Sequence, residues 1–403
     1  MLTPAEALQR ILGLVTPLAQ TEAVPLERAV GRVLSRAPRS DVDLPPFDKS
    51  AMDGFAVQSA DFGPEGVREL ALVGESRAGA PFEGAVGPGE CAAIYTGAEL
   101  PRGADAVVIV EQSRTLPDGR VRLEDRPKVG QHLCRRASDL AVGTEVLGPG
   151  RRVRGVDLAL LAAVGCEPVP VLRRPRVAVL TSGDELVPPD TLPGRGQIRE
   201  GNTLHLAAMA SAAGAEVVLR GVVRDDEGEL QRTFEDALGR CDALLTTGGV
   251  SMGKYDLVGA ALERCGVRGE FHKVAIKPGK PLWFGVRGAV PVFALPGNPV
   301  SCLVNHEVFV APALRVLGGE ARAEVLARPA RGRWRGGARG TNPREQYLPV
   351  RLEPADDGGM DLVPVPWNGS ADVVGISRCA ALAVQRADSS LAPGDVLAYR
   401  PLA

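Results

Sequence analysis

The region between residues 176 and 317 constrains the fold more than any other part of the sequence, because buried-type strands alternate there with helices. We predict strands at 176–180, 216–223, 243–247, 271–277 and 290–295, and helices at 202–213, 227–240, 256–265 and from about 300 to 317. This alternation indicates a mostly parallel sheet sandwiched between helices. In such sheets ligands bind beyond the carboxyl ends of the strands.

The unusual residues of this region follow the predicted strand ends. In chain order the strands run into Thr181-Ser182-Gly183-Asp184-Glu185, Arg224-Asp225-Asp226, Thr247-Gly248-Gly249, Lys277-Pro278-Gly279-Lys280 and Pro296-Gly297-Asn298-Pro299. Glycines without a Cβ let backbone N–H groups approach an anion, the helix start that follows adds its positive dipole end, and lysines add charge. If the sheet is parallel, all these ends lie on one rim, and the simplest ligand for that rim carries phosphate or another oxyanion.

Some of these residues have a structural explanation as well. Asp226 and Glu229 fit a capping box for the helix at 227, which leaves Asp225 free to face the rim. Asp256 is explained equally well as a helix cap and as a ligand. Lys273 and Lys277 fall on the same side of their predicted strand, roughly 13 Å apart at ~3.3 Å per residue. Either they hold two ends of a long ligand, or one of them serves structure, and Lys277 lies nearer the rim.

The chain of 403 residues is too long for one core, so two to four domains are expected. Helices predicted at 3–16, 25–36 and 156–164 bracket a stretch of short alternating strands, and a second β unit with Pro/Gly turns closes the chain. The predicted fold is therefore multidomain α/β and β. Its parts are a discontinuous helical domain (1–50 with 141–174), an inserted β domain (51–140), the α/β domain (175–322) and a barrel-like C-terminal β domain (323–403).

Composition excludes several classes of protein. The net charge of -2 gives no global field that favours nucleic acid or membrane. The seven cysteines lie far apart without a C-x-x-C pair, which is typical of a reducing compartment. The longest uncharged stretch, 289–305, is broken by three prolines and is not a membrane span. We expect a cytoplasmic protein.

Three motifs that suggest other functions do not hold. The run from Gly248 to Lys254 is one residue short of a P-loop, and Tyr255 occupies the place of the Mg²⁺-binding hydroxyl. The four histidines are scattered, and His306 lies with Glu307 inside the long helix. The Arg/Gly-rich segment 328–339 fits solvated arginines on an exposed strand better than RNA binding.

Three polar residues outside the α/β region have only a local explanation from their own chemistry. Asp53 lies in a loop of small residues after two prolines, Thr96 precedes Gly97 at a strand end, and Ser370 follows Gly369. Each fits a turn residue. The cationic loop 134–139 fits a solvated surface.

Taken together, six motifs resemble the MoeA family of molybdopterin molybdenumtransferases, which is related to the gephyrin E domain. They occur in family order along almost the whole chain: Pro46-Phe47-Asp48-Lys49-Ser50-Ala51-Met52-Asp53-Gly54, Thr96-Gly97-Ala98, Gly183-Asp184-Glu185-Leu186, Gly248-Gly249-Val250-Ser251-Met252-Gly253, Lys277-Pro278-Gly279-Lys280-Pro281 and Leu295-Pro296-Gly297-Asn298-Pro299-Val300-Ser301.

The resemblance implies four domains per subunit and an elongated homodimer. It implies that molybdate is inserted into adenylylated molybdopterin, with AMP released and Mg²⁺ assisting. It places the site between the α/β domain of one subunit and the β insert of the other. Molybdopterin-adenylylating or cofactor-delivery proteins would be further partners.

The resemblance also implies roles for single residues. Its catalytic positions are Asp53, Thr96, Glu185, Asp225, Asp256, Lys273 and Lys277, and its cofactor-binding positions are Gly248, Gly249, Ser251, Lys280, Pro296, Pro299 and Ser370. Glu185, Asp225 and Asp256 would hold Mg²⁺ through oxygen ligands. The metal and the lysines would neutralise the phosphoanhydride and stabilise charge on departing AMP.

The chain departs from the family pattern in places, and other functions stay open. Lys49 stands where the family often has Asn, and Glu200 where it has Asp; Cys134, Ala137 and Ser138 replace Arg, Gly and Glu. Tungstate is nearly the size of molybdate, so a tungstate-inserting enzyme is one alternative. A molybdopterin adenylyltransferase would not need the β insert or the C-terminal unit, and the acids and lysines argue against a non-catalytic scaffold.

Overall fold

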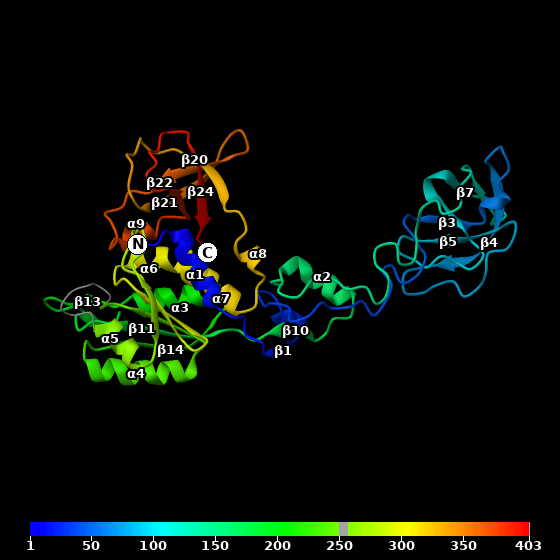
Figure 1. Cartoon of the computed structure of the whole chain (residues 1–403). Coiled ribbons are helices and arrows are strands. Elements are labelled where there is room, and N and C mark those ends of the chain that lie inside the picture. Colours follow the sequence, from blue (N-terminus) through cyan, green and yellow to red (C-terminus); the bar gives the residue numbers. More distant parts are fainter. Residues whose placement is uncertain (250–256, 403) are drawn as a thin grey trace.

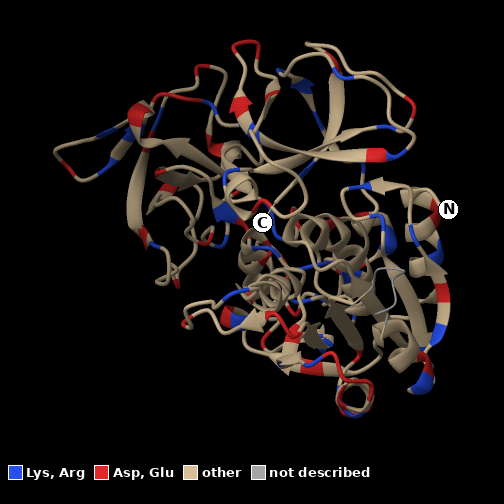
Figure 2. Ribbon diagram, turned by 90° about the vertical axis from the view of Figure 1, so that its left-hand side faces the viewer, with Lys and Arg blue, Asp and Glu red and all other residues tan. Residues whose placement is uncertain are grey.

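The computed structural model describes residues 1–249 and 257–402. Figure 1 shows an elongated molecule: both termini lie in one body with the α/β sheet and the C-terminal β unit, and the inserted β domain lies at the far end, beyond a narrow middle section. Acidic and basic positions are interspersed along the ribbon in Figure 2, without one element that gathers all the basic residues. This distribution agrees with the absence of a global field.

The central sheet has six strands in the order β14-β11-β15-β19-β18-β16. Four of them are parallel neighbours: β14 (Glu216–Val223), β11 (Arg176–Ser182), β15 (Ala243–Thr247) and β19 (Val290–Leu295). These four confirm the predicted strands, although β11 extends two residues further. Their carboxyl ends therefore share one border of the sheet.

The predicted strand at 271–277 is wrong. The chain forms β16 (Arg268–His272), turns at Lys273 with a φ of 75°, and pairs again only at β17 (Ile276–Lys277). A strand that the sequence did not reveal, β18 (Trp283–Arg287), runs antiparallel to both β16 and β19. Since β18 is antiparallel to both β16 and β19, β16 runs parallel to β19. Lys273, directly after β16, therefore lies at the border where the parallel strands end.

Helices cover both faces of this sheet (Figure 1). One face packs against α1 (Pro4–Leu14), α3 (Asn202–Ala212), α6 (Pro299–Asn305) and α7 (Ala311–Leu317), with a π-helical turn, η4 (His306–Val310), between the last two. The other face packs against α4 (Glu227–Arg240) and α5 (Leu257–Arg264). Capping explains two starts, because the side chains of Thr3 and Asp226 accept bonds from Glu6 N and Glu229 N.

Within the described residues, one helical stretch is long and apolar enough to cross a membrane, namely Pro299–Leu317. It is 83% buried inside the protein, where it packs under the sheet. Burial in the core accounts for its apolar composition.

The inserted β domain has a core of its own, which includes Val57, Leu70 and Val108. Its six-stranded sheet has the order β6-β3-β5-β4-β8-β7. The strands are β3 (Gly54–Val57), β4 (Arg68–Ser76), β5 (Glu90–Ile94), β6 (Ala106–Ile109), β7 (Ser113–Thr115) and β8 (Val121–Leu123), with short helical turns η2 (Ser59–Asp61) and η3 (Val110–Gln112).

Two chain segments join this domain to the rest, and they are held together by β2 (Lys49–Ser50) paired with β9 (Leu133–Cys134). Arg135 Nη1 lies 2.6 Å from Asp48 Oδ2, and Arg136 Nε lies 2.5 Å from Asp43 Oδ2. The loop is solvent-exposed, as its composition indicated, and its arginines also tie the two segments together.

The middle section contains α2 (Gly155–Ala163) and a small sheet of β1 (Thr21–Val24) with β10 (Val169–Leu172). The helix predicted at 25–36 is wrong: only a 3₁₀ turn, η1 (Leu26–Arg28), forms. Gly31 then takes a φ of 78°, and Val33 makes a β-bridge to Arg152. The helical spacing of apolar residues was overridden by this left-handed glycine.

The C-terminal unit closes into a five-stranded barrel, because β21 pairs with both β22 and β23. Its strands are β20 (Ala330–Trp334), β21 (Glu345–Pro354), β22 (Met360–Pro364), β23 (Ala381–Gln385) and β24 (Val396–Pro401), with α8 (Arg322–Val325) before it and α9 (Val373–Ile376) inside it. Strand β17 of the α/β region pairs with β21. Two strand pairings cross the predicted domain ranges, namely this one and that of β2 with β9, and the boundaries themselves stay predictions.

The arginines of the segment 328–339 are largely occupied. Arg333 pairs with Asp357 and Arg335 with Asp361. These ion pairs engage two arginines of the segment within the C-terminal unit.

Candidate active site

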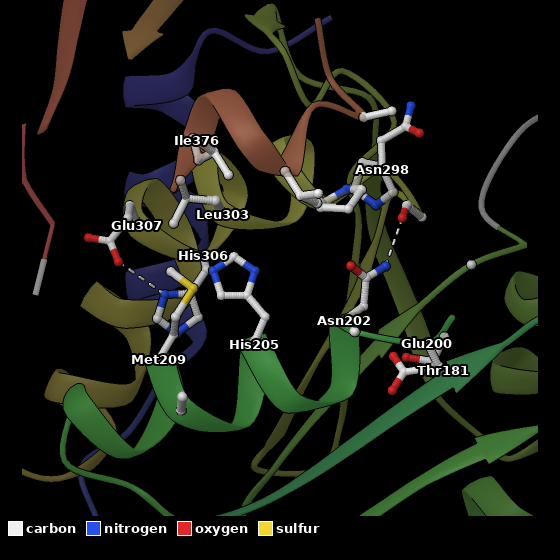
Figure 3. Close-up of a pocket in the computed structure, with 18 of the residues that line it drawn as sticks. Thr181, Glu200, Asn202, His205, Met209, Asn298, Leu303, His306, Glu307 and Ile376 are labelled. Carbon is white, nitrogen blue, oxygen red and sulfur yellow. Dashed lines mark hydrogen bonds and ion pairs between the residues drawn. The ribbon is translucent and has the colours of Figure 1, made fainter. Parts of the chain in front are cut away.

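A large cleft opens along the border where the parallel strands end. Its volume is about 1530 Å³, more than the roughly 300–1,000 Å³ of most small-molecule sites, so it has room for a long ligand. It continues from the strand ends into a channel between α3, α6–α7 and α9 (Figure 3). The elements around it are thus the sheet, the helices of one face and the C-terminal barrel.

Six of the predicted site residues line this cleft. They come from the ends of four parallel strands: Glu185, Asp225, Gly248, Gly249, Pro296 and Pro299. The parallel order brings them together, as we expected from the strand ends. Ser251 and Asp256 lie outside the described residues.

The turn after β15 leaves its backbone bare. Gly248 and Gly249 have φ values of 94° and 58°, which L side chains rarely adopt. A Cβ on Gly248 would overlap the carbonyl oxygen of Ser182, and one on Gly249 would lie 2.9 Å from Val258 Cγ2. Only glycine fits at both positions, and the turn presents backbone rather than side chains to the cleft.

Two hydroxyls lie at the end of β11, beside this turn. Thr181 and Ser182 are only 3% and 5% exposed, and neither side-chain oxygen has a hydrogen-bond partner among the described residues. Both residues line the cleft. Sequence reasoning listed them only as strand-end residues, because an unpaired hydroxyl has no local signature.

Adjacent carboxylates after β14 have different tasks. Asp226 Oδ1 accepts from Glu229 N at 2.8 Å and caps α4, which confirms the structural explanation given to it. Asp225 is exposed and lines the cleft, and its backbone N–H donates to Asp184 Oδ1 at 3.3 Å. Glu185 is likewise an exposed carboxylate of the cleft.

The loop after β19 forms the opposite wall. Asn202 Nδ2 donates to Gly297 O at 2.7 Å, and Thr247 Oγ1 donates to Pro296 O at 2.9 Å. Sequence reasoning missed Asn202 as a site residue; its place directly after Gly201, at the start of a helix, was the available signal. These two bonds hold the carbonyls of the loop, so its shape is set by the sheet and by α3.

Ser370 holds the same loop from the barrel. It does not line the cleft, but its hydroxyl accepts from Asn298 Nδ2 at 3.0 Å and its carbonyl accepts from Val300 N at 3.0 Å. Its position supports a role in orienting the wall.

The three lysines are not among the cleft-lining residues. Lys277, the last residue of β17, and Lys280, in the loop between β17 and β18, are both exposed, and this loop meets the cleft through Pro281. The carbonyl of Gly279 in this loop accepts from Asn305 Nδ2 at 3.0 Å. The predicted strand breaks at Lys273, so Lys273 and Lys277 do not belong to one strand. The prediction that they share one side of a strand is therefore wrong.

Asp53 and Thr96 lie together, but in the remote β domain (Figure 1). The backbone N and the Oγ1 of Thr96 both donate to Asp53 Oδ1 at 2.7 Å. These bonds, the backbone one first, lower the pKa of Asp53 below its usual value. Within one chain this pair and the cleft occupy different ends of the molecule.

Two histidines meet in the inner part of the cleft, although they are scattered in sequence. His205 of α3 and His306 of η4 lie side by side with Glu307, whose Oε1 is 3.4 Å from His306 Nδ1 (Figure 3). Burial lowers the pKa of His205, and the nearby His306 lowers it further. Among the described residues, no group of three or more His, Cys, Asp or Glu side chains could hold a metal ion by itself.

Comparison with known proteins gives a consistent result along the chain. Residues 2–165 match the family described as "MoeA N-terminal region (domain I and II)", and residues 178–316 match the "Probable molybdopterin binding domain". Molybdopterin molybdenumtransferase of Haemophilus influenzae is 36% identical over 320 residues, which cover 79% of this chain and 78% of that protein. The enzyme of the same name from Staphylococcus aureus is 30% identical over 376 residues, 93% of this chain and 88% of that protein.

Solved structures agree over the full length. The molybdopterin biosynthesis MoeA protein from Pyrococcus horikosii superposes with a TM-score of 0.81 at 31% identity, covering 100% of this chain and 99% of that one. The similarity therefore extends to the remote β domain and the barrel.

Proposed function

The chain belongs to the MoeA family of molybdopterin molybdenumtransferases, enzymes of molybdenum cofactor biosynthesis, and we propose that it inserts molybdate into adenylylated molybdopterin with release of AMP. The observation that carries this proposal is the cleft itself. It unites two exposed carboxylates with a turn of bare backbone at one border of the sheet. A long ligand with anionic phosphates at its centre needs both.

Phosphate binding is the first task of this cleft. Gly248 and Gly249 leave backbone groups open to an oxyanion, and successive N–H groups in such turns form anion-binding concavities. The neighbouring wall of Pro296 and Pro299 limits where a second oxyanion can sit. We propose that the pterin phosphate occupies the glycine turn and that molybdate binds beside it.

Glu185 and Asp225 fit Mg²⁺. This cation is usually held by one or two carboxylates together with substrate phosphates and water, and it does not need a complete protein cage. Two exposed carboxylates at the cleft meet that requirement. Bound there, Mg²⁺ would supply positive charge to the phosphoanhydride oxygens.

Residues 277–280, which we call the lysine loop, supply cations from the chain itself. Lys277 and Lys280 are exposed and flank Gly279, whose carbonyl is held by the buried Asn305. When the phosphoanhydride bond breaks, negative charge grows on the departing AMP. We propose that these ammonium groups stabilise that charge.

Asp53 and Thr96 require a second copy of the chain if they act in this cleft, since the fold separates them from it in one chain. We propose a homodimer in which the β domain of one subunit reaches the cleft of the other. The hydrogen bonds from Thr96 keep Asp53 ionised and oriented for a role at that junction.

We propose a cytoplasmic location and contacts with proteins that supply the adenylylated pterin or receive the cofactor. All seven cysteines are free thiols, which supports a reducing compartment.

An assay of AMP release tests the proposal. The purified protein is incubated with adenylylated molybdopterin, Mg²⁺ and molybdate, and Asp225→Ala is compared with Asp226→Ala. We expect wild type to release AMP, Asp225→Ala to lose most of that activity, and Asp226→Ala to retain it while losing about 1 kcal/mol of stability with its helix cap. Absence of AMP release by wild type, or full activity of Asp225→Ala, would contradict the proposed mechanism. Competition by tungstate in the same assay distinguishes a tungstate-inserting enzyme.

A further inference from the structure

The hydroxyl of Ser182, a residue that lines the cleft, has no hydrogen-bond partner among the residues that the structure describes. Ser182 is the last residue of β11 and is 5% exposed, and its Oγ makes no hydrogen bond within the described part of the chain. A buried hydroxyl without a partner is unfavourable, because it has given up its bonds to water. Such a group either is tolerated as a defect or is satisfied by something that binds.

Ser182 lies directly against the glycine turn. A Cβ built on Gly248 would be 3.0 Å from Ser182 Oγ, and one built on Gly249 would be 3.4 Å from it. The hydroxyl therefore borders the bare backbone of both glycines. Ser182, Gly248 and Gly249 all line the cleft.

The nearby hydroxyls are not equivalent to it. Thr247 Oγ1 already donates to Pro296 O at 2.9 Å. Thr181 also lacks a partner, but neighbouring strand residues point to opposite faces of a sheet, so it faces the side of Asn202 and Glu200 (Figure 3). Ser182 is thus the hydroxyl on the side of the turn.

We propose that Ser182 is a ligand of the tetrahedral oxyanion that binds at the Gly248–Gly249 turn. This inference rests on the proposed function. The ligand chemistry is that of a tetrahedral oxyanion, which the substrate phosphate and molybdate share. An oxygen of the anion accepts a hydrogen bond from the Ser182 hydroxyl. The two glycines, which have no side chains, let the anion come close enough for that bond.

The inference predicts that one substitution leaves the stability of the unliganded protein equal or higher but weakens oxyanion binding. Ser182→Ala removes an unsatisfied buried hydroxyl, so the unliganded protein has a Tm equal to or above that of wild type. The same change removes a hydrogen bond to a charged ligand, so the Kd of the bound oxyanion rises roughly tenfold or more. A merely structural serine would give a lower Tm and an unchanged Kd.

Thr246 provides the matched control. Its Oγ1 also has no partner within the described residues and it is 1% exposed, but it does not line the cleft. Thr246→Val keeps the shape and removes the hydroxyl, so it raises or maintains the Tm and leaves oxyanion binding unchanged. Ser182→Thr keeps the hydroxyl and is expected to retain most of the affinity.

Calorimetric titration of the full-length protein with inorganic phosphate and, separately, with molybdate distinguishes the two sources of the oxyanion. Weaker binding of phosphate alone assigns Ser182 to a phosphate, and weaker binding of molybdate alone assigns it to the metal oxyanion. Unchanged Kd values for both ligands in Ser182→Ala, or a loss of affinity in Thr246→Val as large as in Ser182→Ala, would overturn the inference. Because these titrations do not use turnover, the proposed reaction can fail in the AMP-release assay while Ser182 still binds an oxyanion, and the reverse.

Discussion

At the scale of single residues, the same kind of side chain takes different tasks according to the donors around it. Asp226 accepts a helix N–H and serves the fold, whereas Asp225, one residue earlier, faces the cleft. Asp53 accepts two bonds from Thr96 and stays exposed. Donors that favour the charged form keep a carboxylate ionised, and this is the property a site for a cation or a polarised substrate needs.

The Asp53–Thr96 pair gives a prediction about pH. Thr96→Ala removes the hydroxyl donor but leaves the backbone N–H, so the pKa of Asp53 should rise part of the way toward its ordinary value of 3.8. Since a lowered carboxyl pKa stabilises the fold above the pKa of the unfolded chain, this contribution is lost only as the pH falls below about that value. An NMR titration of the Asp53 carboxyl carbon measures the change. Thr96→Ser should keep the low pKa, and an unshifted value in Thr96→Ala would show that the hydroxyl is irrelevant.

At the scale of elements, the ends of strands decide the site. Strands β11, β14, β15 and β19 end at one border because they are parallel, and the turn after β15 lies close enough to β11 that no side chain fits. At the β18–β16 edge of the sheet the strands are not all parallel, because β18 runs antiparallel to β19. The lysine loop begins there at β17, which pairs with β21 of the barrel. The Gly248–Gly249 turn is therefore positioned by the sheet, and the segment with Lys277 and Lys280 is positioned by contacts with α6 and β21.

Substitution in the glycine turn tests this placement. Gly248→Ala forces a side chain into left-handed backbone and against the Ser182 carbonyl, so the Tm should fall by roughly 5 °C or more and AMP release should be lost. The matched control is Gly297→Ala, where the nearest atom to a new Cβ is Gly248 Cα at 3.8 Å and the backbone is ordinary. It should change the Tm little. Thermal unfolding measures both, and equal Tm values for the two variants would contradict the close packing described here.

At the scale of the whole molecule, the elongated shape separates the cleft from the Asp53–Thr96 pair, although the proposed reaction uses both. The β domain has its own sheet and core, and it joins the remainder through two segments tied by the Asp48–Arg135 and Asp43–Arg136 pairs. The strand ends that border the cleft belong to the body with both termini, whereas β3 and β5, next to Asp53 and Thr96, lie at the other end of the molecule (Figure 1). A dimer whose subunits lie in opposite directions would bring them together.

Mixing two inactive variants tests that arrangement. Asp53→Ala and Asp225→Ala should each lose AMP release as homodimers. A heterodimer has one site with both aspartates intact, so random reassociation of equal amounts should restore about a quarter of wild-type activity. Activity is measured after the two proteins are dissociated and reassembled together. If the mixture stays inactive while wild type survives the same treatment, each site is built from one chain.

Local patterns were sufficient for much of the fold. The strands at 216–223, 243–247 and 290–295 and the helix at 227–240 were predicted with their observed bounds, because apolar period and capping residues act over a few neighbours. The convergence of Glu185, Asp225 and the glycine turn followed from the rule that parallel strands end together. Contacts between distant segments decided the rest. The reversal at β18, the break at Lys273 and the separation of Asp53 from the cleft depend on which segments pack together. The same holds for the Ser182 hydroxyl, which finds no partner in the described part of the chain, and no window of neighbouring residues carries that information.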